Sequence, residues 1–129
     1  MKIKTFKLIG ITLDWAVAKC LGVRFDSGNH LADADAVLLA WVRLWQAGED
    51  RFSSDWALGG PIKEREKIET RWIITDSEGG GYWQAANLFT DTYGYTHQKS
   101  ELTAAMRCFV AGKLGDDVDV PDTIVNLAK

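Results

Sequence analysis

The stretch that decides the fold reads Ser100-Glu101-Leu102-Thr103-Ala104-Ala105-Met106-Arg107-Cys108-Phe109-Val110-Ala111-Gly112-Lys113-Leu114-Gly115. Ser100 is a favourable N-cap residue, Glu101 brings a carboxylate to the positive end of a helix dipole, and Gly115 is typical just past a helix end. Between these ends an apolar stripe recurs at helical spacing and consists of Leu102, Ala105, Met106, Phe109, Val110 and Leu114. We therefore predict an amphipathic helix over these residues.

Upstream, a second helix is predicted between Thr12, a suitable N-cap, and Gly22, a suitable residue after the last turn. Its apolar stripe consists of Leu13, Ala16, Val17, Cys20 and Leu21. Trp15 lies about 200° around the helix from Leu13, because successive residues turn by about 100°. We therefore predict that Trp15 points away from the core.

A third helix is predicted over residues 31–46. It is apolar nearly all round, which is typical of a helix that is either central or shared with a partner subunit. Trp41 and Trp45 are one turn apart, and we interpret them as core or subunit-interface residues. A homo-oligomer formed through this helix is therefore an open alternative.

Strands are predicted around a glycine-rich turn at residues 76–81. The predicted strands cover residues 1–9, 61–68, 70–75 and 82–88. We predict a loop at 51–62, irregular structure at 90–98 and an extended tail that contains Val118 and Val120.

The whole chain, residues 1–129, is predicted to be a single domain, because 129 residues is an ordinary domain size. Hydrophobic residues make up 47% and charged residues 26%, which is the balance of a globular protein. We predict an α+β fold in which two or three helices pack on one face of a small, mainly antiparallel sheet.

Several functions are disfavoured by the sequence. The net charge is −3 and no basic block occurs, so affinity for a nucleic acid backbone is not expected. No stretch approaches the roughly 20 apolar residues of a membrane span. His30 and His97 have no metal-ligand spacing, and no GxSxG nucleophile motif occurs. We therefore expect no catalysis, no metal and no cofactor, with an unrecognised hydrolase as the alternative.

Cys20 and Cys108 are the only cysteines and have no CxxC spacing. Because both fall inside predicted helices, we expect reduced, buried thiols that act as small hydrophobes. Lys113 lies only about 20° around the helix from Leu102. Either its stem is buried with the ammonium at the rim, or its charge is aimed into a pocket.

Aromatic residues provide the functional signal. The chain holds six Trp, five Phe and three Tyr, and several lie outside obvious core positions. Tyr93 and Tyr95 flank a glycine in the irregular segment. Tyr82 and Trp83 are adjacent on a predicted strand, so one of the pair should face each side, and one of them is predicted to lie across from Trp56.

Around Trp56 a carboxylate, a stacking surface and two glycines fall within one short segment, which suits ribose hydroxyls, a base and a phosphate. The predicted ligand-binding residues are Trp15, Asp55, Trp56, Gly59, Gly60, Tyr82, Trp83 and Arg107. The alternative is that Gly59 and Gly60 shape the entry to a strand while Trp56 plugs the core.

Three segments together resemble the NinX family of lambdoid bacteriophage proteins. The segments are Leu13-Asp14-Trp15-Ala16-Val17-Ala18-Lys19-Cys20, Ser54-Asp55-Trp56-Ala57-Leu58-Gly59-Gly60-Pro61-Ile62 with Glu64-Arg65-Glu66, and Leu102 to Val110 continuing through Lys113-Leu114-Gly115-Asp116 to Val120-Pro121. Residues 23–50 and 76–98 lie outside this pattern. The resemblance implies a phage accessory protein of unassigned function. Because no signal peptide or membrane span is predicted, we expect such a protein in the host cytoplasm.

Our functional hypothesis is a non-enzymatic protein that binds and sequesters a small nucleotide-type signalling molecule. Its use as a counter-defence factor rests on analogy with other small phage accessory proteins. The alternative hypothesis is a protein-binding module that inhibits a host enzyme through an aromatic patch, because protein interfaces use the same residue types.

Overall fold

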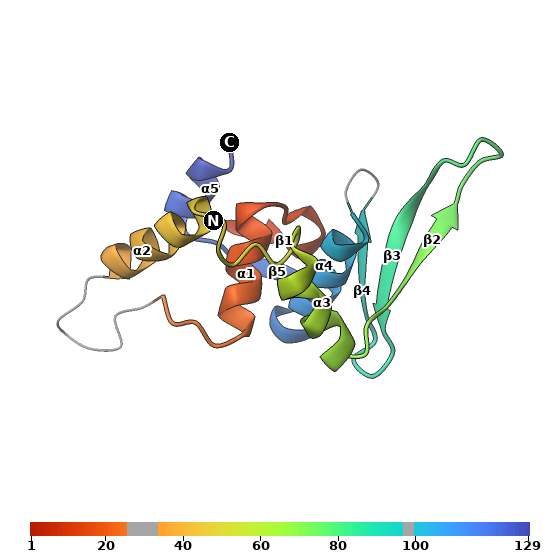
Figure 1. Ribbon diagram of the computed structural model, residues 1–129, viewed down its shortest axis with the longest axis horizontal. Coiled ribbons are helices and arrows are strands. Elements are labelled where there is room, and N and C mark those ends of the chain that lie inside the picture. The colour runs from red at the N-terminus through yellow and green to blue at the C-terminus, as the bar shows by residue number, and fades with distance from the viewer. Residues whose placement is uncertain (26–33, 97–99) are drawn as a thin grey trace.

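Helix α4 (Glu101–Leu114) is the centre of the fold, with α1 (Ile11–Cys20) and α3 (Trp56–Arg65) packed against it and a three-stranded sheet beside it (Figure 1). Residues 102–110 are all buried. The Ser100 hydroxyl accepts a hydrogen bond from the Thr103 amide, and Gly115, with φ +84°, follows the last turn. The helix predicted over these residues is confirmed at both ends.

The structure, a computed structural model, describes residues 1–25, 34–96 and 100–129. His30, His97 and the first residues of the helix predicted over 31–46 lie outside these ranges. The remaining elements are β1 (Lys2–Lys4), the 3-10 helix η1 (Thr5–Lys7), α2 (Ala34–Gln46), β2 (Glu69–Ile74), β3 (Gly81–Asn87), β4 (Thr92–Thr96), β5 (Asp117–Asp119) and α5 (Asp122–Leu127).

The larger sheet has the strand order β2-β3-β4, and both of its pairings are antiparallel. Ala85 of β3 pairs with Thr70 on one side and with Gly94 on the other, and this row faces α4. Gly94 touches the helix backbone, so the tyrosines on either side of it, Tyr93 and Tyr95, project from the opposite face of the sheet. The α+β fold with a small antiparallel sheet is confirmed. Only α4 packs broadly on that sheet, and α1 and α3 lie behind it.

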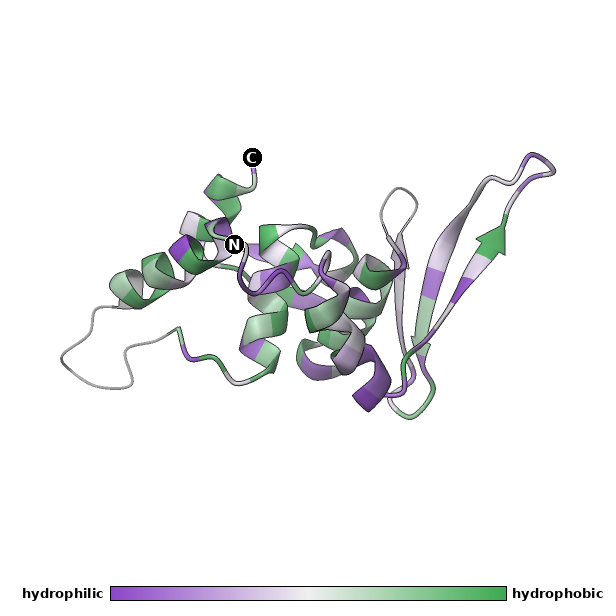
Figure 2. Cartoon of the chain, in the orientation of Figure 1, coloured by the Kyte–Doolittle hydropathy of each residue, from purple (hydrophilic) through white to green (hydrophobic). Residues whose placement is uncertain are grey.

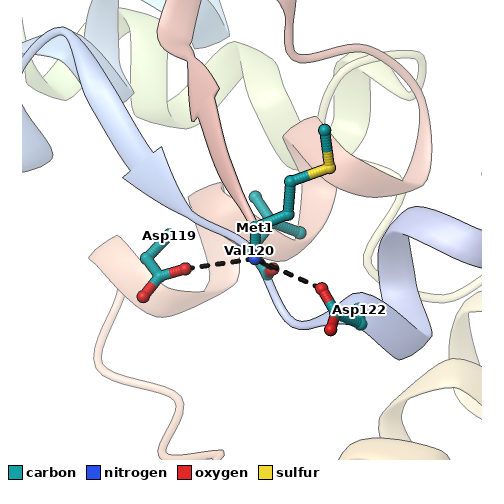
Figure 3. A network of polar contacts seen from close by, with 4 residues as sticks. All are labelled: Met1, Asp119, Val120 and Asp122. Atoms are coloured by element: carbon teal, nitrogen blue, oxygen red, sulfur yellow. Dashed lines mark hydrogen bonds and ion pairs between the residues drawn. The ribbon is translucent and has the colours of Figure 1, made fainter.

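A second sheet joins the two ends of the chain. Strands β1 and β5 pair antiparallel, with Ile3 opposite Val118. The amino group of Met1 donates to the Val120 carbonyl at 2.8 Å and lies 3.3 Å from the carboxylates of both Asp119 and Asp122 (Figure 3). The strand predicted over residues 1–9 is thus only partly right, because it ends at Lys4 and η1 follows.

The loop predicted at 51–62 is right only for residues 51–55, and the strand predicted at 61–68 is wrong, because residues 56–65 form α3. Asp55 caps this helix by accepting from the Ala57 amide at 3.0 Å. Pro61 lies inside the helix and has no N–H to donate to the carbonyl of Ala57, four residues earlier. Ala57 is exposed, so water can reach this carbonyl. Gly59 is required by packing, since a Cβ there would be 2.2 Å from the Phe52 carbonyl oxygen.

The prediction that Trp15 points away from the core is also wrong. Residues 11–18 of α1 are all buried, so this helix has no solvent side over that length. Trp15 is 3% exposed and packs on Phe25, whose ring in turn meets Trp41 edge to face at 5.7 Å. Amphipathic spacing therefore underestimated how much of α1 is covered.

Asp14 connects three segments of the core. Its carboxylate accepts from the Trp45 indole N–H at 2.8 Å and from the Ser53 amide at 2.8 Å. The residue is 1% exposed, and burial raises the pKa of its carboxyl above the ordinary value. Trp41 donates its indole N–H to Asp50, so the indole N–H groups of both tryptophans of α2 have hydrogen-bond partners within the chain.

Candidate functional site

A cavity of about 730 Å³ lies at the free edge of β4, between that strand, η1 and the middle of α4. It is lined by Lys4, Thr5, Phe6, Asp91, Thr92, Tyr93, Tyr95, Thr96, Arg107, Ala111 and Asp116. This volume falls in the range of pockets that hold small organic ligands and cofactors. The lining combines aromatic rings with charges of both signs.

Arg107 lies on the side of the cavity formed by α4, and it is 8% exposed. Its Nε donates to the Leu8 carbonyl at 2.8 Å and its Nη1 donates to the Tyr95 carbonyl at 2.5 Å. Within the described ranges no carboxylate is within ion-pair distance of this guanidinium, and burial lowers its pKa. A buried positive charge with only neutral partners favours a bound anion.

The wall opposite β4 is η1, which comes from the start of the chain but is held by the end of α4. The Thr5 hydroxyl donates to the Gly115 carbonyl at 2.6 Å, and the Thr5 amide donates to the Asp116 carbonyl at 2.8 Å. These bonds leave Phe6 at the surface, 59% exposed, on the rim of the cavity. An apolar ring held in this position is available for stacking.

The tyrosines of β4 form the aromatic side of the cavity. The rings of Tyr93 and Tyr95 are stacked, with centroids 6.4 Å apart and an angle of 17° between their planes. Both side chains are partly exposed, and the Tyr93 hydroxyl donates to Asp91 at 3.1 Å. This pair can hold a flat ring, and Asp91 can accept hydrogen bonds from hydroxyl or amino groups.

Charges at the mouth of the cavity are mixed. Lys4 pairs with Asp117 at 2.9 Å, and this hydrogen bond raises the pKa of the Lys4 ammonium. Asp91 and Asp116 also line the cavity. In the part of the chain that the structure describes, no group of three or more His, Cys, Asp or Glu is placed to hold a metal ion.

The residues predicted around Trp56 lie elsewhere, on α3. The Asp55 carboxylate is used as a helix cap, and the Gly59 amide donates to the Asp55 carbonyl at 2.9 Å. Neither group is directed at a ligand as the loop interpretation required. Trp56 is 49% exposed and borders a shallower hollow of about 500 Å³ with Gly60, on one side of α3.

The aromatic residues predicted to face Trp56 point in two directions on β3. Trp83 packs edge to face on Trp72 at 5.4 Å, on the side of α4, whereas Tyr82 approaches Tyr95 at 6.0 Å on the outer face. The prediction that one of the pair faces each side is confirmed. Neither residue borders the hollow beside Trp56, and Trp15 is a core residue. Of the predicted ligand-binding residues, Arg107 is the one that lines the β4 cavity.

The open question about Lys113 is answered by its position. Its side chain is 50% exposed and its ammonium lies 3.9 Å from Glu66 and 5.9 Å from the centre of the Phe109 ring. The charge is therefore at the surface, as in the buried-stem alternative. Both cysteines are free, Cys108 is buried as predicted, and Cys20 is only half-buried.

A family model described as "Bacteriophage P22, NinX" matches residues 4–113. The chain belongs to the NinX family. The match covers every residue of the β4 cavity except Asp116, and it includes η1, β4 and nearly all of α4. The predicted resemblance is thereby confirmed, and the protein is a member of a phage protein family. No curated protein matches the chain.

The helices of this NinX-family chain can also be compared with the length and hydropathy of a membrane span. None of the helices described in the structure is long and apolar enough to cross a lipid bilayer.

Sequence reasoning missed Thr5, Phe6 and Asp91, which have no motif of their own. It noted Tyr93 and Tyr95 as aromatic residues that flank a glycine but did not assign them to the site. The signal that could have found them is the Tyr-Gly-Tyr alternation at 93–95, which turns both rings to one face of a strand.

Proposed function

We propose that this protein is a non-catalytic phage accessory protein that binds a small nucleotide-type molecule in the β4 cavity. The observation that carries the proposal is Arg107, a buried guanidinium without a carboxylate partner in the described chain, which lines the same cavity as the stacked pair Tyr93 and Tyr95. A nucleotide presents an anion and a flat ring a short distance apart. The cavity supplies a partner for each.

The proposed arrangement assigns a role to each side of the cavity. Arg107 and Lys4 meet the phosphate, and both lie on the side nearer η1 and α4. Tyr93, Tyr95 and Phe6 provide surfaces for the base, and stacking on each aromatic ring is worth about 1–3 kcal/mol. Asp91 accepts from ribose hydroxyls or from an exocyclic amine.

The biological use that we propose is sequestration of a nucleotide signal of the host cell. A binder without catalysis lowers the free concentration of a signal in proportion to its own abundance, so tight binding suffices. Membership in a phage family supports a role directed at the host. Binding measurements with different nucleotides can identify the signal.

Thermal shift and calorimetry with cyclic dinucleotides, ADP-ribose and mononucleotides test the proposal. A ligand that binds only the folded state stabilises it by about 2.7 kcal/mol at a hundredfold excess over Kd. Phe6→Ala should weaken binding by about tenfold, since one stacking surface is lost, and should leave the melting temperature nearly unchanged because Phe6 is exposed. The matched control is Phe89→Ala, an 88% exposed ring outside the cavity.

A second candidate function is supported by the exposed apolar side chains of the sheet. Leu88 is 71% exposed and Phe89 88% exposed at the connection between β3 and β4. Such residues are typical of a surface that binds another protein. This alternative predicts no stabilisation by any nucleotide and capture of one host enzyme that Phe89→Ala, but not Phe6→Ala, releases.

A further inference from the structure

The β2–β3 hairpin extends away from the helices, and β2 is its outer strand (Figure 1). Among the described elements only β3 pairs with β2. The Thr75 amide donates across the hairpin to the Gly80 carbonyl at 2.8 Å, so odd-numbered residues of this strand direct their backbone groups toward β3. The N–H and C=O groups of Thr70, Trp72 and Ile74 therefore point to the free edge.

This free edge is also apolar, as the green colour at the end of β2 shows (Figure 2). Trp72 is 41% exposed and Ile74 is 69% exposed, and both project from the same face of the strand. The charged residues of the strand, Glu69 and Arg71, lie in its first half, and residues 72–74 contain neither a charge nor a proline. Natural proteins usually protect an exposed edge with such residues, so the unprotected end of β2 indicates a segment that is meant to be paired.

We propose that β2 pairs antiparallel with β2 of a second copy of this chain, about a two-fold axis at Ile73. In this register Trp72 of each copy lies opposite Ile74 of the other, so the exposed apolar side chains cover each other. Ile73 faces Ile73 of the second copy, and Arg71 faces Thr75. The two pairs of Trp72 with Ile74 exchange about four backbone hydrogen bonds.

Neighbouring registers match the side chains less well. An axis at Trp72 would place Ile74 opposite the polar Thr70 and Arg71 opposite Ile73. A two-fold axis at Arg71 would place two guanidinium groups directly opposite each other, which is unfavourable. An axis at Thr70 would oppose Glu69 and Arg71, but it would leave Ile74 beyond the end of the partner strand. A surface ion pair between Glu69 and Arg71 contributes less free energy than burial of the Ile74 side chain, so the axis at Ile73 is favoured.

The proposed dimer joins two three-stranded sheets into one continuous sheet. Its interface is at β2, whereas the cavity is at β4, the opposite edge of the same sheet. Both cavities therefore stay open in the dimer. Formation of the dimer and binding of a nucleotide are independent and can be tested separately.

Sedimentation equilibrium of the full chain over a wide concentration range tests the pairing. We expect the wild type to reach twice the monomer mass and Ile74→Lys to remain monomeric, because a buried ammonium would oppose Trp72. The matched control is Leu88→Lys, which introduces the same charge at a similarly exposed apolar position and should still dimerise. A wild-type chain that stays monomeric throughout, or an Ile74→Lys chain that associates as tightly as Leu88→Lys, would overturn the proposal.

Cross-linking tests the register. In a Cys20→Ser background, Ile73→Cys should oxidise to a disulfide-linked dimer, because a non-hydrogen-bonded pair brings its two Cα atoms to about 4.5 Å. Arg71→Cys is the control, since in the proposed register it faces Thr75 instead of itself. Equal or faster dimer formation by Arg71→Cys would overturn the assignment of the axis to Ile73.

Discussion

Gly94 of β4 lies directly on the backbone of Ala104 in α4, so that a Cβ at position 94 would stand 2.0 Å from the Ala104 carbonyl oxygen. The same Cβ would be 2.6 Å from the Cys108 amide nitrogen. Neither atom can move without distorting the helix. This contact sets the distance between the strand and the helix, and it turns Tyr93 and Tyr95 away from α4.

Gly94→Ala should therefore destabilise the fold by about 1–3 kcal/mol or more, as overpacking against backbone does. Urea unfolding measures the change. Gly112→Ala is the matched control, because the nearest atoms to its Cβ would be the Thr92 and Thr90 hydroxyls, at 3.4 and 3.5 Å. Alanine is the better helix former, so this control should be neutral or more stable by about 0.5–1 kcal/mol. Equal stability of the two variants would contradict the close packing of β4.

Asp14 should make stability depend on pH. Burial raises the pKa of its carboxyl in the folded state above the value of about 3.9 that an unfolded chain has. In the pH range between the two values the folded protein binds more protons than the unfolded chain. The stability that Asp14 contributes is thus fully present below the unfolded pKa and is lost as pH rises through the folded pKa.

The test compares the wild type with Asp14→Asn by urea unfolding at a series of pH values upward from about 4. The free energy of unfolding of the wild type, measured relative to the variant, should fall as pH rises. Subtracting the variant removes the contributions of all other carboxylates. A difference that is constant or rises with pH would show that the two hydrogen bonds to Asp14 outweigh its burial.

The two cysteines should react slowly and in a fixed order. Burial raises the pKa of the Cys20 thiol to about 11, so about one thousandth of it is thiolate at pH 8. Cys108 is 1% exposed, and burial raises its pKa as well. Labelling with a thiol reagent followed by mass spectrometry should modify Cys20 first and Cys108 only on unfolding. Labelling of both in the native protein at the rate of free cysteine would contradict this order.

Trp56→Ala distinguishes the β4 cavity from the site first predicted around Trp56. Because Trp56 is about half exposed, its loss should cost at most about 1 kcal/mol of stability, and nucleotide binding should be unchanged. Trp15→Ala is the comparison, since removal of a buried indole costs about 3–5 kcal/mol. Lost binding in a stably folded Trp56→Ala chain would return the ligand site to α3.

The parts of the fold that sequence reasoning predicted are those with local signals. Ser100 and Gly115 mark the ends of α4 through their own backbone chemistry, and the glycine-rich turn at 76–81 marks the hairpin. These signals depend on neighbours in the chain. They need no knowledge of what packs against them.

The parts that it missed depend on tertiary contacts. Strand β4 places small residues, Thr92, Gly94 and Thr96, toward the helix and its large rings outward, which reverses the usual alternation. The glycines of α3 suggested a loop because sequence alone does not show the Phe52 carbonyl that Gly59 accommodates. The cavity combines residues from both ends of the chain, and no spacing rule connects them.

The wall that η1 contributes to the cavity has a consequence for synthesis on the ribosome. Thr5 leaves the ribosome long before Gly115 and Asp116, whose carbonyls hold it in place. Closing a loop of this length carries a large entropic cost, so the contact forms after the local helices and the hairpin. A nascent chain that has not yet reached Asp116 can fold its hairpin, yet it has no means of holding η1 in place. The cavity is therefore completed only after Asp116 has left the ribosome.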